Sequence, residues 1–315
     1  MGNLLGIITM LCLVGMPLQA HAAKAAKAKA VPAKTARSAP TQVHKAPAAR
    51  SSSGGHGLAH EWEPVSELKS YKKNYLLVYS LSNNQNNLPT STNPSNQVLI
   101  PYALDIKEAK FQISVKHVLA DFQEYGALWL AYTQRSFWQL YDVANSRPFR
   151  ENNYEPEFIY SLRPNEASIF NFGYVHQSNG ESNPRSRSWD RVYVQPGVEF
   201  SNGGGARIIL LARWWERLQE NFASDDNPDI VNYLGYREFE LRYIEDGDWE
   251  IAAISRINSF QLDIAAPWTS WLGLSNDGDH NGNVHLQYFK GYGESLLDYN
   301  QSHVSWGVGL SFPFE

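Results

Sequence analysis

Apolar and polar residues alternate one by one over long stretches of the chain, most clearly near its C-terminus. From Val304 to Phe314 every even position carries a large apolar side chain, whereas the odd positions from His303 to Pro313 carry His, Ser, Gly or Pro. Because successive side chains of a strand point to opposite faces, this period of two predicts a strand with one apolar face. Its length of about eleven residues suits a tilted bilayer crossing better than a soluble sheet.

The same alternation recurs along the chain in twelve segments. An even number of strands is expected when a single chain closes an outer-membrane barrel. We therefore predict an all-β protein, a single-chain antiparallel transmembrane β-barrel of about twelve strands, with a narrow interior filled by side chains. A secreted β-sandwich also alternates and is the alternative fold. The predicted strands are 74–82, 108–119, 124–138, 154–163, 167–178, 188–200, 206–218, 231–243, 249–257, 259–266, 283–290 and 303–314.

The connections between the predicted strands alternate in length. Those after the first, third, fifth, seventh and eleventh strands are long and rich in Asn, Asp, Ser and Pro, and those after the second, fourth, sixth and eighth are short. Long external loops and short periplasmic turns are typical of outer-membrane barrels. Two connections depart from this rule, because the one after the ninth strand is tight and 267–282 is long.

The first 22 residues are expected to be a signal peptide. The apolar stretch 4–14 is too short to span a bilayer as a helix. It is followed by Pro17 and by Ala20-His21-Ala22, a small-residue pattern that suits cleavage after Ala22. The only cysteine, Cys12, lies within this stretch, so the mature chain would contain no disulfide and no cysteine nucleophile.

Residues 23–57 are predicted to be a basic, low-complexity linker, followed by the barrel domain at 58–315. The linker is rich in Ala, Lys, Pro and Ser and has no apolar periodicity. It is either a solvated spacer or a segment that touches anionic headgroups or the cell wall. It holds seven of the 27 Lys and Arg, so the remaining chain carries 20 basic and 32 acidic side chains, a net charge of −12. This balance argues against nucleic acid as a partner.

Three polar residues fall on the face that the alternation assigns to lipid. His176 and Ser178 continue the parity of the lipid-facing aromatic residues before them, and Asp190 shares the parity of the apolar residues after it. A turn near Asn183-Pro184 would place Asp190 opposite His176. This arrangement permits a hydrolytic chain in which Ser178 attacks, His176 takes its proton and Asp190 orients the imidazole. The alternative is that the strand has left the bilayer by residue 176 and the three groups are merely solvated.

Two further sequence features bear on binding. Asp277-Gly278-Asp279-His280-Asn281-Gly282 matches the first half of a calcium-binding EF-hand loop, but Tyr288 stands where the loop requires Glu, which favours an ordinary polar turn. Gln134 shares the lipid-facing parity of Leu128, Leu130 and Tyr132. Its amide is either exposed at the rim or in need of a partner.

Several motifs together resemble one family. His176-Gln177-Ser178-Asn179-Gly180 and Ser186-Arg187-Ser188-Trp189-Asp190-Arg191 resemble the active-site signature of the outer-membrane phospholipase A family, which are twelve-stranded lipase barrels. The resemblance extends from about Tyr75 to the C-terminus. Further segments that resemble the family, in order and with fitting spacing, are Tyr132-Thr133-Gln134, Pro148-Phe149-Arg150-Glu151, Asn153-Tyr154-Glu155-Pro156, Asp226-Asn227-Pro228-Asp229-Ile230 and Gly291-Tyr292-Gly293-Glu294-Ser295.

The resemblance implies a catalytic assignment. Ser178 would be the nucleophile and His176 the general base. Asp190 stands where the best-known family pattern has Asn, which gives this chain a carboxylate as the third member. The amide of Gly180 would stabilise the oxyanion together with calcium.

The resemblance also implies a metal and an assembly. Calcium would be bound by the backbone carbonyl of Glu181, by the hydroxyl of Ser186 and by a group at Ser146 of a second barrel. Glu181 stands where the familiar pattern has Arg. The active form would be a homodimer that pairs lipid-facing walls, with Gln134 in the interface.

The expected activity follows from that assignment. It is calcium-dependent hydrolysis of the acyl esters of glycerophospholipids, of the phospholipase A1/A2 and lysophospholipase type. The expected location is the bacterial outer membrane, with the site toward the outer leaflet. The alternative function is a non-catalytic barrel, either a narrow channel or a structural anchor.

Overall fold

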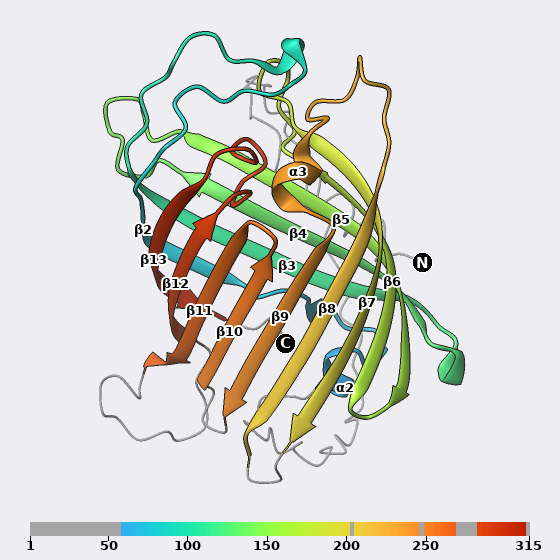
Figure 1. Ribbon diagram of the computed structural model, residues 1–315. Helices are drawn as coiled ribbons and strands as arrows, with labels where there is room; N and C mark the ends of the chain where they lie inside the picture. Colours follow the sequence, from blue (N-terminus) through green and yellow to red (C-terminus); the bar gives the residue numbers. More distant parts are fainter. Residues whose placement is uncertain (1–57, 202–204, 246–248, 269–281, 313–315) are drawn as a thin grey trace, which may run out of the picture. The chain divides into compact units, whose positions relative to one another are not determined.

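The computed structural model describes residues 58–201, 205–245, 249–268 and 282–312. The predicted signal peptide and linker, Asp277 to Asn281 and Phe314 lie outside these ranges. Twelve strands, β2 to β13, each pair antiparallel with the next, and β13 pairs with β2, which closes the sheet (Figure 1). The predicted twelve-stranded antiparallel barrel is therefore confirmed. Among the described residues no helix is long and apolar enough to span a membrane.

The barrel strands lie close to their predicted ranges. A two-residue strand, β1 (Lys69–Ser70), pairs with β3 before the barrel begins. Short helical segments are α2 (Leu58–Glu61), η1 (Pro94–Asn96), η2 (Gln123–Tyr125) and α3 (Ile230–Leu234). The barrel strands are β2 (Tyr75–Ser82), β3 (Lys107–Asp121), β4 (Ala127–Trp138), β5 (Phe149–Asn165), β6 (Ser168–Ser178), β7 (Ser188–Ser201), β8 (Arg207–Leu218), β9 (Arg237–Glu245), β10 (Trp249–Arg256), β11 (Ser259–Pro267), β12 (Asn283–Gly291) and β13 (His303–Ser311).

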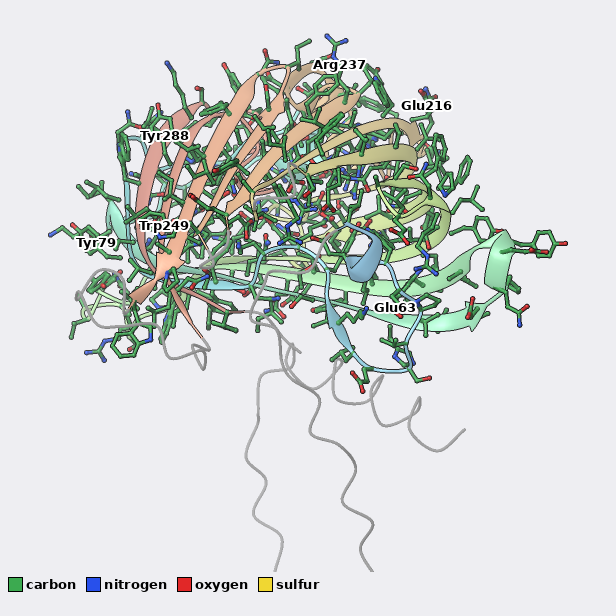
Figure 2. The ribbon with its side chains drawn as sticks, turned by 90° about the horizontal axis from the view of Figure 1, so that it is seen from below. Glu63, Tyr79, Glu216, Arg237, Trp249 and Tyr288 are labelled. Carbon is green, nitrogen blue, oxygen red and sulfur yellow. The ribbon has the colours of Figure 1, made fainter. Side chains whose placement is uncertain are left out.

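The side chains alternate across the barrel wall as the sequence predicts. On β13, Trp306 and Leu310 are 60% and 50% exposed, whereas Ser305 and Ser311 are buried. Tyr79 and Tyr288 project from the outer surface in the view along the barrel (Figure 2). The apolar parity therefore faces outward, where the hydrocarbon of a membrane would cover it.

The interior is packed with charged side chains that neutralise one another. Arg150 donates to both carboxylate oxygens of Glu108, at 2.9 and 3.0 Å, and to Asp298 at 2.5 Å. Lys110, fully buried, contacts Glu294 at 2.8 Å. A buried charge is tolerated when it is paired and hydrogen-bonded. The paired charges and their side chains thus fill the interior that the strand number makes narrow.

An apolar cluster lies inside the barrel at each end. At the end with the short turns, Leu58 and Trp62 pack against Trp129 and Ile209. At the end with the long loops, Leu296 packs with Trp189 and Trp215 in a second cluster. The segment 58–62 and the loop after β12 therefore occupy the two ends of the lumen.

Two predicted strands begin too early: 124–138 by three residues, because β4 starts at Ala127, and 231–243 by six. The structure has helix α3 at Ile230–Leu234, and β9 starts only at Arg237. Ile230 and Leu234 are four residues apart, so a helical turn buries both against the cluster at the long-loop end. Gly235, with φ +70°, ends the helix.

Candidate active site

The hairpin of β6 and β7 positions the three residues predicted to form the site. Antiparallel pairing places His176 directly opposite Asp190, and Ser178 opposite Ser188. The residues of opposite parity on these strands, such as Val175 and Trp189, are buried in the lumen. His176, Ser178 and Asp190 therefore lie on the outer face of the barrel, at the end with the long loops.

His176 and Asp190 form a hydrogen-bonded pair. The ring nitrogen Nδ1 of His176 lies 2.9 Å from Oδ1 of Asp190. Because a carboxylate only accepts, Nδ1 carries the proton and Nε2 is left to accept one. The hydroxyl of Tyr174, one position earlier on the same face, also donates to this Oδ1 at 2.7 Å. Oδ1 of Asp190 thus orients the imidazole of His176, and the hydroxyl of Tyr174 in turn fixes the position of this oxygen.

Ser178 and Gly180 form the other half of the site. The backbone N–H of Gly180 donates to Oγ of Ser178 at 3.1 Å. Gly180 has φ +67°, and a Cβ there would lie 3.1 Å from the ring of Tyr154, so the conformation and the close approach both favour glycine. Ser178 and His176 lie on the same face of β6, but no hydrogen bond joins them among the described residues. Such catalytic bonds are often long in proteins without substrate.

The loop 179–187 is held from beneath by Arg187. Its side chain is fully buried, and its guanidinium donates to the carbonyl oxygens of Ser186 at 2.7 Å, Pro184 at 3.3 Å and Asn96 at 3.1 Å. Burial lowers the pKa of this guanidinium. Its three partners are all neutral carbonyls, so the charge serves to order the loop.

The loop presents oxygen atoms that could hold a hard cation. The hydroxyl of Ser186 donates to Oδ2 of Asp226 at 2.7 Å, and Ser188 donates to the same oxygen at 3.2 Å. Among the described residues the backbone carbonyl of Glu181 accepts no hydrogen bond. Hydroxyl, carbonyl and carboxylate oxygens are the ligands that calcium prefers. Ser146 is exposed in the loop between β4 and β5, with φ +62°, where a second molecule could reach it.

Gln134 faces outward, as predicted, but its amide already has partners. It is 6% exposed, its carbonyl accepts from the hydroxyl of Tyr132 at 3.2 Å, and its nitrogen donates to Ser136 at 3.1 Å. An interface would therefore meet an amide that is partly satisfied within its own strand.

Sequence reasoning missed two residues of the site, Tyr174 and Asp226. Tyr174 was assigned only as a lipid-facing aromatic residue, although its position two residues before His176 was a signal for contact across to Asp190. Asp226 lies in the loop between β8 and β9, and no local pattern connects it with Ser186.

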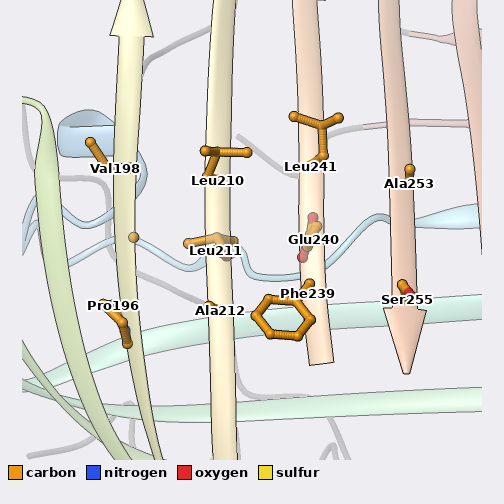
Figure 3. A pocket seen from close by; sticks show the side chains of 11 residues that line it. Pro196, Val198, Leu210, Leu211, Ala212, Phe239, Glu240, Leu241, Ala253 and Ser255 are labelled. Atoms are coloured by element: carbon orange, nitrogen blue, oxygen red, sulfur yellow. The ribbon is translucent and has the colours of Figure 1, made fainter. Parts of the chain in front are cut away.

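A separate groove lies on the same outer wall. It has a volume of about 490 Å³ and crosses β7 to β10 (Figure 3). Its lining includes Pro196, Leu210, Phe239 and Leu241. It contains none of the candidate catalytic residues, although β7 also carries Asp190.

The amino-acid sequence matches known proteins over most of its length. A family model described as Phospholipase A1 matches residues 59–312. A phospholipase A1 of Escherichia coli (strain K12) is 32% identical over 294 residues, which cover 85% of this chain and 89% of that protein. A putative phospholipase A1 of Neisseria meningitidis serogroup B is 33% identical over 260 residues, covering 78% of this chain but only 65% of the longer relative.

Solved structures match the fold as well. Outer membrane phospholipase A from Escherichia coli superposes with a TM-score of 0.63 and 29% identity, covering 78% of this chain and 98% of that one. The outer membrane phospholipase of Salmonella typhi, a dimer with bound calcium, gives a TM-score of 0.66 and 28% identity, covering 82% of this chain and 98% of that one.

Proposed function

This chain belongs to the phospholipase A1 family and is a phospholipid ester hydrolase with the fold of a bacterial outer-membrane protein; on that premise we propose that Ser178, His176 and Asp190 form its catalytic triad. The observation that carries the proposal is the pair of His176 and Asp190, 2.9 Å apart on the outer wall two residues from Ser178. A polar group on a lipid-facing wall is costly without partners, and polar groups that are kept there mark functional sites.

The triad would cleave an acyl ester in two stages. Oγ of Ser178 attacks the ester carbonyl carbon while Nε2 of His176 takes its proton, and Asp190 stabilises the resulting imidazolium. His176 then returns the proton to the leaving alkoxide of the lysophospholipid. Water attacks the acyl-serine by the same route and releases the fatty acid. The N–H of Gly180 points at Oγ of Ser178. It would therefore lie beside the developing oxyanion and could donate a hydrogen bond to it.

The residues of the loop 179–187 fit a calcium ion. The carbonyl of Glu181 and the hydroxyl of Ser186 would bind it, with Ser146 of a second barrel. The carboxylate of Asp226, 2.7 Å from the Ser186 hydroxyl, adds negative charge beside these oxygens. When bound, calcium would supply positive charge next to the developing oxyanion.

Activation by dimerisation is part of the proposal. The exposed Ser146 supports it, because a ligand on one barrel could complete the cation site of another. Gln134 would lie in the interface on the same wall. The bound calcium and the dimer described for the Salmonella typhi protein are consistent with this assembly. The site would face the outer leaflet, since it lies at the end of the barrel with the long loops.

The alternative of a narrow channel has less support. Paired charges such as Arg150 and Glu108 fill the lumen, and an apolar cluster occupies each end of it. The other alternative, a non-catalytic structural anchor, does not agree with membership of a family of phospholipid ester hydrolases.

The test is phospholipid turnover by the purified full chain in detergent, with calcium and with a chelator. We expect the wild type to hydrolyse phospholipid with calcium and to lose the activity with chelator. Ser178→Ala should lose turnover in both conditions while keeping the heat-modifiable migration of a folded barrel. Full activity of Ser178→Ala would eliminate the proposed nucleophile.

A further inference from the structure

The connection between β2 and β3, residues 83–106, rises above the barrel rim and carries the helical turn η1 (Figure 1). Its side chains bind the loop between β8 and β9. Asn93 donates to the carbonyl of Asp225 at 2.8 Å, and Ser91 donates to the carbonyl of Asp226 at 2.7 Å. Tyr102 stacks under the guanidinium of Arg185, 5.1 Å from the ring centre. The connection therefore touches both the loop that carries the proposed ligands Glu181 and Ser186 and the loop that carries Asp226.

Asn96 is the residue at which these loops meet. Its side chain is fully buried. Its amide nitrogen lies 2.9 Å from the carbonyl oxygen of Ser186, 3.0 Å from Oδ1 of Asp226 and 3.1 Å from Oδ1 of Asn183. Its backbone carbonyl accepts from Arg187 at 3.1 Å. The two N–H groups of the Asn96 amide thus serve three acceptors, which come from two different loops. These loops are also joined by the hydrogen bond between Ser186 and Asp226, which are 40 residues apart in sequence.

We propose that Asn96 is a positioning residue for the calcium site. The proposal rests on the proposed function, because it concerns the same loop. One oxygen of Asp226 is bound by Asn96, and the other accepts from the Ser186 hydroxyl. Asn96 therefore fixes both the backbone and the carboxylate partner of the Ser186 ligand before calcium arrives.

The physical reason is preorganisation. A carboxylate and two carbonyl-type oxygens that converge without a donor repel one another, and the loops would separate or admit water. Calcium would then have to order the loops on binding, and that entropy would be subtracted from its affinity. The chemical step, which uses Ser178, His176 and Asp190, would be unchanged once calcium is bound.

The test compares three variants of the full chain in detergent. Asn96→Leu keeps the branched shape and the number of side-chain heavy atoms and removes the hydrogen bonds. Asn96→Ala is a second variant if the larger leucine is not accepted. Gln97→Ala is the matched control, because Gln97 is adjacent to Asn96 and, among the described residues, its side chain donates only to the carbonyl of Ser91 in its own connection. Calcium binding is measured directly by titration calorimetry, and the calcium concentration for half-maximal activity is measured in parallel.

Loss of one to two hydrogen bonds predicts that Asn96→Leu binds calcium about tenfold more weakly. The half-maximal calcium concentration should rise by the same factor, with kcat at saturating calcium within about twofold of the wild type. Gln97→Ala should match the wild type. Unchanged calcium affinity in both folded Asn96 variants would overturn the positioning role alone. A wild type that binds no calcium would instead overturn the metal site of the proposed function.

Discussion

Replacement of Asp190 separates two contributions of its carboxylate. Asp190→Asn keeps an acceptor oxygen for the Nδ1 proton of His176 and for the hydroxyl of Tyr174. It removes the negative charge and puts an amide nitrogen in the place of Oδ2. Asp190→Ala removes the charge and both hydrogen bonds. The two variants should therefore differ in activity, with the asparagine variant the more active.

The geometry sets the expected magnitudes. Over the 2.9 Å that separate Nδ1 and Oδ1, the attraction between imidazolium and carboxylate is about 1.4 kcal/mol in water-like surroundings. The side chains of His176 and Asp190 are 42% and 25% exposed, so the value lies near this limit rather than near that of a protein interior. We expect kcat/KM to fall about tenfold to thirtyfold in Asp190→Asn. Two lost hydrogen bonds at about 1 kcal/mol each bring the loss in Asp190→Ala to several hundredfold.

The assay is calcium-saturated hydrolysis of a phospholipid in detergent micelles. Glu216→Gln is the matched control, because this substitution removes the same charge. Glu216 lies on the neighbouring strand β8, opposite Val192 and on the same outer face as Asp190. It should retain wild-type activity. Equal losses in Asp190→Asn and Asp190→Ala, or no loss in either, would refute the idea that this oxygen orients the imidazole.

Two further substitutions test the site and the fold separately. Tyr174→Phe removes the hydroxyl that donates a 2.7 Å hydrogen bond to Asp190, so kcat should fall about threefold to tenfold with KM unchanged. Steady-state kinetics that show no change would exclude a role for the hydroxyl. Trp62→Ala removes a buried ring whose centre lies 3.4 Å from Nζ of Lys116 and which packs against Trp129. The free energy of unfolding should therefore fall by about 3–5 kcal/mol, with the activity at 25 °C retained. An unaltered midpoint of thermal unfolding would contradict this.

The strands and the pairing of His176 with Asp190 could be predicted because parity is a local property. An outward apolar side chain fixes the direction of its neighbours, and the turn at Asn183-Pro184 fixes the register. The rule fails where the outward residue is polar. Strand β5 begins at Phe149, five residues before the predicted start at 154. The start was predicted too late because Asn152 interrupts the apolar face and because the inward Arg150 and Glu151 resemble loop residues.

Contacts between loops could not be predicted in the same way. Asn96, Ser186 and Asp226 come from three connections. The antiparallel strand order places these connections at one end, and closure of the barrel brings them into contact with one another. The helix α3 was missed for a related reason. Its apolar residues satisfy a strand pattern as well as a helical turn, and burial inside the mouth of the barrel decides between them.

Covalent labelling of Ser178 is the most direct measurement. An alkylsulfonyl fluoride reacts with an activated serine, and the site of the adduct can be located by mass spectrometry of the digested protein. We expect one adduct, on Ser178, in the calcium-loaded wild type, and none in Ser178→Ala or His176→Ala. An adduct on another serine, or labelling of Ser178 that is equally fast without His176, would contradict a nucleophile activated on the outer wall of the barrel.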